Sequence, residues 1–192
     1  DPNNTWYRWC RKQKNQDKEL CLHACDHWNR VPQDTELLEE LHVQSYRLSL
    51  EWSRIEPSEG GFSHQAIHHY RDEIQLLLDQ GIKPLVTLHH FSEPIWFQAL
   101  GGWEKRQNAK LFVRYSRFVV EHLGDLVGDW VTFNEPNVYA TFGYLLGIFP
   151  PGIRNIFKTF KVTAAIIKTH AEIYDLIHKI RAEKQFEGNT MV

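Results

Sequence analysis

The sequence has no long apolar run and almost no net charge, and these two absences exclude several classes of protein. No stretch approaches the roughly 20 apolar residues that span a bilayer, so we expect no membrane segment and no membrane partner. The formal net charge is −2, which gives no electrostatic reason to bind nucleic acid. We therefore expect the partners to be neutral molecules.

Cysteine is also scarce, with only Cys10, Cys21 and Cys25, all near the start of the chain. An odd number of cysteines is no disulfide framework, and it favours a reducing, cytoplasmic location. No charged-then-apolar leader is visible at the start of the chain. Because the first residue is Asp1 rather than Met, a removed leader or an upstream truncation stays open.

Four residues of types that bind zinc alternate near the start of the chain: Cys21, His23, Cys25 and His27. In extended chain they would span roughly 20 Å, at about 3.3 Å per residue, so they cannot converge on one tetrahedral ion. The sequence therefore predicts no metal site in this segment.

The composition is that of a folded protein, with 42% hydrophobic and 13% aromatic residues in a chain of 192. Residues 1–30 are polar and aromatic without periodicity, and we predict an irregular N-terminal segment there within a single domain over 1–192. A complete eight-unit α/β barrel needs about 250 residues, so we expect at most part of one.

Beyond this segment, strand and helix patterns alternate. Alternation of side chains and flanking turn residues predict strands over 46–52, 84–90 and 130–135. Helical periodicity predicts a short helix that starts near Pro32, with Asp34 as a candidate cap. It predicts three further helices over about 67–78, 108–123 and 160–177. The last helix carries an apolar stripe made of Phe160, Ala164, Ile167, Ala171, Tyr174 and Ile177.

This alternation predicts an α/β fold. Strands that alternate with helices form right-handed βαβ units and a parallel sheet, and Met191-Val192 is expected to begin a further strand. No Gly-x-Gly-x-x-Gly or Walker-type loop follows any predicted strand. That absence favours a barrel over an open, nucleotide-binding sheet.

Polar side chains stand at the ends of the predicted strands, where chemistry gathers in parallel α/β folds. The three ends carry Glu51-Trp52, His89-His90 and Asn134-Glu135. Because a residue before proline is biased toward extended backbone, Pro136 predicts an extended Glu135 with its carboxylate at the rim of the sheet.

Several motifs in order carry a family resemblance from Ala24 to Gly152. They are Ala24-Cys25-Asp26-His27, Tyr46-Arg47-Leu48-Ser49-Leu50-Glu51-Trp52-Ser53-Arg54-Ile55, Thr87-Leu88-His89-His90-Phe91, Gly101-Gly102-Trp103, Thr132-Phe133-Asn134-Glu135-Pro136, Gly143-Tyr144 and Pro150-Pro151-Gly152. With them the chain resembles glycoside hydrolase family 1, the family of β-glucosidases, 6-phospho-β-glucosidases and β-galactosidases. The resemblance implies a (β/α)8 TIM barrel, of which this chain holds about strands two to four and their helices.

The resemblance implies a role for each matching residue. Glu135 would be the general acid/base, Asn134 the donor to the sugar 2-hydroxyl, and His90 a hydrogen-bond partner of the sugar in the innermost subsite. Arg47 would lie inside the barrel beside the nucleophile carboxylate, and Phe91 stands where the family commonly has Trp. The expected substrate is a terminal β-linked glycoside or oligosaccharide, with no metal and no organic cofactor.

A retaining glycosidase also needs a nucleophile carboxylate about 5–5.5 Å from the acid/base. The resemblance implies that this glutamate lies on barrel strand seven, beyond the end of the chain. Because a partial barrel leaves strand edges open, we expect a complementary C-terminal barrel segment or self-association. The alternatives are a non-catalytic sugar-binding or structural half-barrel without a nucleophile, and another barrel glycosidase family with Asn-Glu on strand four.

Overall fold

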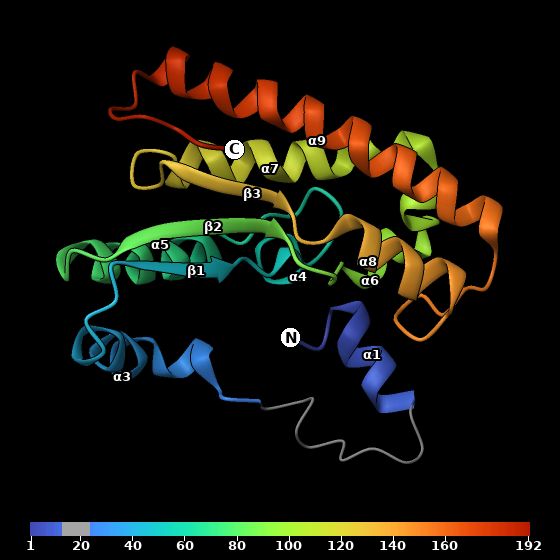
Figure 1. Cartoon of the computed structure of the whole chain (residues 1–192), viewed down its shortest axis with the longest axis horizontal. Helices are drawn as coiled ribbons and strands as arrows, with labels where there is room; N and C mark the ends of the chain where they lie inside the picture. Colours follow the sequence, from blue (N-terminus) through green and yellow to red (C-terminus); the bar gives the residue numbers. More distant parts are fainter. Residues whose placement is uncertain (13–23) are drawn as a thin grey trace.

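The computed structural model describes residues 1–12 and 24–192. At its centre lies a three-stranded parallel sheet in the order β1-β2-β3 (Figure 1). The strands are β1 (Ser45–Ser49), β2 (Lys83–His89) and β3 (Asp129–Phe133). The predicted parallel α/β architecture is therefore confirmed.

Helices connect and cover the strands, as Figure 1 shows. Helix α5 (His64–Asp79) connects β1 to β2, α7 (Ala109–Leu123) lies between β2 and β3, and α9 (Ile156–Lys184) follows β3. Shorter elements are α1 (Thr5–Lys12), α3 (His27–Glu40), α4 (Trp52–Ile55), α6 (Ile95–Ala99), α8 (Pro136–Ala140), the 3-10 turns η1 (Gly102–Glu104) and η2 (Arg106–Asn108), and the π-helical turn η3 (Thr141–Leu145).

The core lies between the sheet and the helices of its outer layer. Leu48, Val86 and Trp130 are aligned across the three strands, so their side chains share one face, and all three are buried. Trp52 is also buried, with its ring centroid 4.7 Å from that of Phe97. These contacts fix the outer face of the sheet and leave the opposite face for polar side chains.

The first strand is shorter than predicted. The alternation of buried and exposed side chains extends past Ser49, but the ladder ends there and α4 begins at Trp52. The Glu51 carboxylate accepts a hydrogen bond from the backbone N–H of Ser53 and so caps this helix. A period of two alone cannot detect such a cap.

The prediction of an irregular segment over residues 1–30 is wrong for Thr5–Lys12 and from His27 onward, which are helical. Helix α1 begins after Asn4, whose side-chain oxygen accepts from the backbone N–H of Tyr7 at 2.7 Å. Arg11 and Lys12 occupy its last turn, where cations complement the helix dipole. The cap and these charges are the sequence signals that could have found the helix.

Helix α3 also differs from its prediction. It begins at His27 rather than near Pro32, and its backbone has a non-helical break at Arg30. Asp34 is not its cap, because it lies inside the helix, where its carboxylate contacts His27 Nδ1 at 2.5 Å. Of the alternating cysteines and histidines, Cys21 and His23 lie outside the described residues.

Helix α9 buries only the last residue of its apolar stripe, Ile177. Within this stripe Phe160 is 68% exposed and Ile167 is 60% exposed, whereas Ile166 and Ile173, outside the stripe, face the core.

No helix in the described part of the chain is long and apolar enough to cross a membrane.

Candidate active site

The ends of the three strands bring polar side chains together on the face of the sheet away from the core. Arg47 of β1 donates from Nε to Thr87 Oγ1 at 3.0 Å and from Nη2 to Asn134 Oδ1 at 2.6 Å. Asn134 follows β3 and is buried. Arg47 therefore joins all three strands at the edge where the sequence predicted a site.

The hydrogen bond from Arg47 sets the orientation of the Asn134 amide. A guanidinium only donates, so the amide oxygen must face Arg47, and the amide nitrogen is left to donate elsewhere. Asn134 can thus offer an N–H to a hydroxyl of a bound ligand.

His90 lies next to this group, on the loop that follows β2. Its Nδ1 is 2.7 Å from Ser49 Oγ. Desolvation by the surrounding residues and then the positive charge of Arg47 lower the pKa of His90 below its usual range. The ring is therefore neutral near pH 7 and can exchange hydrogen bonds with neutral hydroxyl groups.

Glu135 follows Asn134 and has an exposed side chain. Its backbone is left-handed, with φ 40° and ψ 60°, and Pro136 is the first residue of α8. The prediction of an extended Glu135 is therefore wrong: its backbone turns directly into the helix, and the carbonyl of Glu135 accepts from Tyr139 N at 3.0 Å. A non-glycine residue in this region is uncommon and strained, and such strain clusters at functional sites.

A buried acidic residue that sequence reasoning missed lies beneath this turn. Glu93 is 3% exposed, and its Oε1 accepts from Trp103 Nε1 at 2.7 Å and from the hydroxyl of Tyr139. His89 Nε2 is 3.3 Å from the same oxygen. Burial and then the Glu93 charge raise the pKa of Tyr139 well above its usual range, so its hydroxyl stays a donor.

A second carboxylate anchors the N-terminal segment to the sheet. Glu51 Oε2 accepts from Asn4 Nδ2 and from Ser92 Oγ, each at 3.0 Å. Trp6 Nε1 also donates to the carbonyl of Phe91 at 3.0 Å. The site is thus bordered by α1, a helix that the sequence did not predict.

Comparison with known proteins identifies relatives of this arrangement. The family model described as glycosyl hydrolase family 1 matches residues 2–190. "Beta-glucosidase A" of Thermotoga maritima is 41% identical over 149 residues, which is 77% of this chain and 33% of that protein. The "Cytosolic beta-glucosidase" of Homo sapiens is 35% identical over 176 residues, covering 90% of this chain and 37% of that protein.

Solved structures agree with the sequence relatives. The "beta-glycosidase from Pyrococcus horikoshii" superposes with a TM-score of 0.84 at 41% identity and covers 92% of this chain and 41% of its own. The "Family 1 b-glucosidase from Thermotoga maritima" has a TM-score of 0.87 at 36% identity, covering 91% and 40%. The fold is therefore part of a (β/α)8 barrel, and the chain spans about a third of the length of the curated relatives it matches.

Proposed function

Because the chain belongs to glycosyl hydrolase family 1, we propose that it carries the acid/base side of a retaining β-glycosidase that acts on terminal β-linked glycosides. The observation that supports this most is the hydrogen bond from Arg47 to Asn134, next to the left-handed Glu135. It gathers the three strand ends into one polar cluster.

Glu135 is the proposed general acid/base. In the first step it donates its proton to the glycosidic oxygen while a nucleophile glutamate attacks the anomeric carbon and the leaving group departs. In the second step the Glu135 carboxylate removes a proton from water, and the resulting hydroxyl displaces the nucleophile from the sugar. The nucleophile is proposed to come from a segment that is not in this chain.

The neighbouring residues are proposed to hold the sugar. The Asn134 N–H that Arg47 leaves unused would donate to the sugar 2-hydroxyl, a contact that strengthens as the oxocarbenium-like transition state forms. His90, held neutral and contacting Ser49, would bind another hydroxyl. Arg47 would pair with the nucleophile carboxylate, which compensates its charge once the barrel closes around it.

A complementary C-terminal barrel segment is the proposed partner. Met191 already pairs with Asp129 in parallel, and Trp130 N donates to the Met191 carbonyl at 2.8 Å, which begins a fourth strand beside β3. The sheet otherwise ends at open edges, which favour pairing with further strands. The proposed partner would be contradicted if sedimentation finds a monomer of 22.7 kDa and that monomer is stable and unfolds cooperatively.

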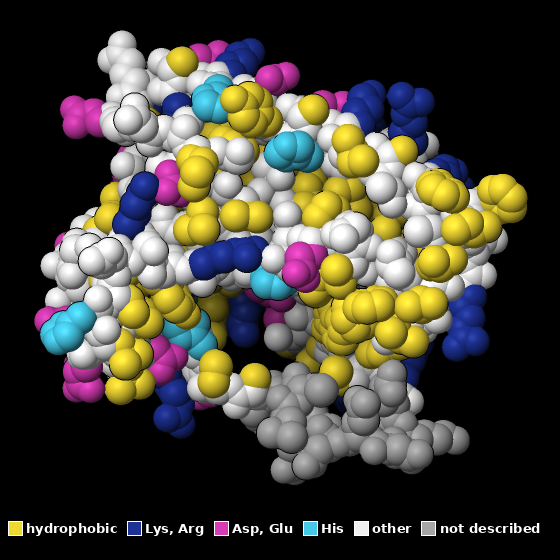
Figure 2. Space-filling view, in the orientation of Figure 1, with side chains coloured by type: hydrophobic (Ala, Val, Ile, Leu, Met, Phe, Trp, Pro, Cys, Tyr) yellow, Lys and Arg dark blue, Asp and Glu magenta, His cyan; other side chains and the backbone are white. Residues whose placement is uncertain are grey.

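Exposed apolar side chains support the same partner. Figure 2 shows hydrophobic side chains gathered at the lower right, over α1 and the segment between α8 and α9, and more at the start of α9. Large exposed patches of this kind mark interaction surfaces. Exposed large side chains in this region are Leu145, Leu146, Ile148, Ile156, Phe157 and Phe160. A second copy of the chain is the alternative occupant of this surface.

We also propose a cytoplasmic location, because the odd number of cysteines is no disulfide framework and fits a reducing compartment.

The test compares hydrolysis of aryl and alkyl β-glucosides by the parent protein and by Glu135→Gln, with intact mass defining which polypeptides are present. General acid/base catalysis contributes about 10²–10⁴-fold, so the variant should lose about that much on the alkyl glucoside. The loss in bond cleavage should be smaller for a nitrophenyl glucoside, because its leaving group needs less protonation. Glu187→Gln, an exposed glutamate near the C-terminus, is the matched control.

An equal loss on both substrates would contradict the acid role of Glu135. Inactivity of a homogeneous 192-residue chain would instead favour the second candidate, a non-catalytic sugar-binding or structural half-barrel. That candidate is supported by the share of the relatives that the chain spans.

A further inference from the structure

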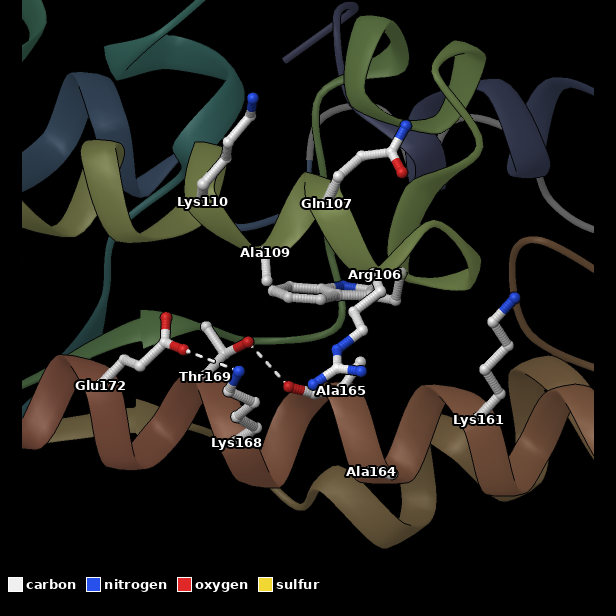
Figure 3. A pocket seen from close by; sticks show the side chains of 11 residues that line it. Arg106, Gln107, Ala109, Lys110, Lys161, Ala164, Ala165, Lys168, Thr169 and Glu172 are labelled. Atoms are coloured by element: carbon white, nitrogen blue, oxygen red, sulfur yellow. Dashed lines mark hydrogen bonds and ion pairs between the residues drawn. The ribbon is translucent and has the colours of Figure 1, made fainter.

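A groove of about 930 Å³ lies between α7 and α9, on the outer side of the sheet (Figure 3). Its walls come from η1, η2 and the start of α7 on one side and from α9 on the other. None of Arg47, His90, Asn134 and Glu135 lines it. The groove is therefore separate from the proposed active site, and its shape depends only on elements within this chain.

Four cations border the groove: Arg106, Lys110, Lys161 and Lys168. Only Lys168 has an ion-pair partner within residues 1–12 and 24–192, at 3.6 Å from Glu172. In Figure 3 the Arg106 side chain extends from its wall toward Ala165 on the opposite helix. The single carboxylate cannot balance these charges, so the groove favours a negatively charged occupant.

The floor of the groove is apolar. Ala164 and Ala165 lie on α9 between Lys161 and Lys168, which are about 10 Å apart along a helix that rises about 1.5 Å per residue. Ala109 faces them from the start of α7. The small side chains let an apolar body approach the helix backbone closely.

Most of the hydrogen-bonding side chains that line this groove are charged, and the neutral ones are Gln107, Thr169 and Trp103. The Thr169 hydroxyl is already committed to the carbonyl of Ala165 at 2.7 Å, and Trp103 is buried to 1% exposure, which leaves no open ring face for stacking. Apolar pockets of about 300–1,000 Å³ with a few polar groups are typical of small-molecule sites. The chemistry thus fits an amphipathic molecule better than a glycan.

We propose that this groove is a binding site for an amphipathic organic anion, an alkyl or aryl body with a carboxylate or sulfate head. The apolar body lies on the alanine floor, and Arg106 and the lysines hold the head. The proposal does not depend on the glycosidase function, because none of the four residues proposed to act on or hold the sugar lines the groove.

Calorimetric titration of the full chain with octyl sulfate tests the site, with octanol as the neutral analogue. We expect octyl sulfate to bind about tenfold more tightly than octanol, and to weaken as salt is added. Arg106→Gln combined with Lys161→Gln should weaken octyl sulfate binding about tenfold. Lys179→Gln combined with Lys184→Gln removes the same charge from α9 outside the groove and should leave binding unchanged.

A second variant tests the floor independently of charge. Ala165→Leu places a larger side chain on the groove floor with a residue that favours helix, and it should reduce binding while circular dichroism shows an intact fold. Equal affinity for octanol and octyl sulfate, or equal loss in the two charge-removal variants, would overturn the proposal. Unchanged binding by the correctly folded Ala165→Leu protein would overturn it as well.

Discussion

Replacement of Glu93 is predicted to destabilise the elements that surround the candidate active site. Its Oε1 accepts from Trp103 Nε1 at 2.7 Å and from the Tyr139 hydroxyl, and these donors come from η1 and α8. Glu93 itself follows β2 and is 3% exposed. One buried carboxylate thus connects three elements, including the helix that begins directly after Glu135.

The expected size of the effect follows from the donors that lose their acceptor. Glu93→Ala removes the shared acceptor of the buried Trp103 N–H and Tyr139 O–H, and each buried donor that loses its acceptor costs about 1–3 kcal/mol. We therefore expect the free energy of unfolding to fall by about 3–5 kcal/mol, as when one partner of a buried ionic group is removed. Glu93→Gln keeps an acceptor oxygen at the same place, so its loss should be about 1–2 kcal/mol.

Equilibrium unfolding in urea, followed by circular dichroism, measures these changes under identical conditions. The control is Glu121→Ala on the exposed face of α7, where Glu121 is 3.5 Å from Arg117 in a surface ion pair. That pair should contribute less than about 1 kcal/mol. A loss below about 1 kcal/mol for Glu93→Ala, or an equal loss for Glu93→Gln, would refute the network as the source of stability.

Two further perturbations follow from the N-terminal part of the chain. Burial opposes protonation of His27, but hydrogen bonds to Asp34 and Glu73 outweigh it and raise its pKa. Because the folded pKa exceeds the unfolded value, the contribution of His27 to the free energy of unfolding is complete below about pH 6.5 and is lost as pH rises through the folded pKa. The urea midpoint should therefore fall over this pH range, and His27→Gln should make that fall smaller. Asn4→Ala removes the cap of α1 and should lower the stability of this helix by about 0.5–2 kcal/mol. Amide hydrogen exchange should become faster within α1 only. Unchanged protection of α1 would contradict the capping role.

Local patterns in the sequence predict much of this fold. The apolar stripes of α5 and α7 predict both helices, and Gly81 and Gly124 lie just beyond their ends. The strands before His90 and Glu135 are predictable because the side-chain pattern and flanking residues of a strand are set over a few positions. Since parallel strands end at one edge, His90 and Asn134 are expected together from the strand pattern. Arg47 lies within its strand, and only the family resemblance places it at the site.

Other features depend on contacts between residues distant in sequence, which no local pattern contains. The Asn4 amide donates to Glu51 over a separation of 47 residues, and the carboxylate of Glu93 accepts from Tyr139 over 46. The left-handed backbone of Glu135 was missed for a different reason, because it departs from a local rule. The residue before a proline is normally extended, and here the start of α8 and its buried Tyr139 override that preference.

The face of α9 is informative because sequence and structure disagree there. Phe160, Ile167 and Tyr174 repeat at helical spacing, which is the pattern of a buried stripe, yet the structure leaves all three exposed and buries the face with Ile166 and Ile173. A helix that is apolar on two faces is expected to pack against neighbours on both. Helix α9 has α7 on one side, and in a βα barrel a helix following the next strand packs against its other side. The exposed stripe therefore supports the same conclusion as the strand begun at Met191: the sequence is patterned for a larger barrel than this chain contains.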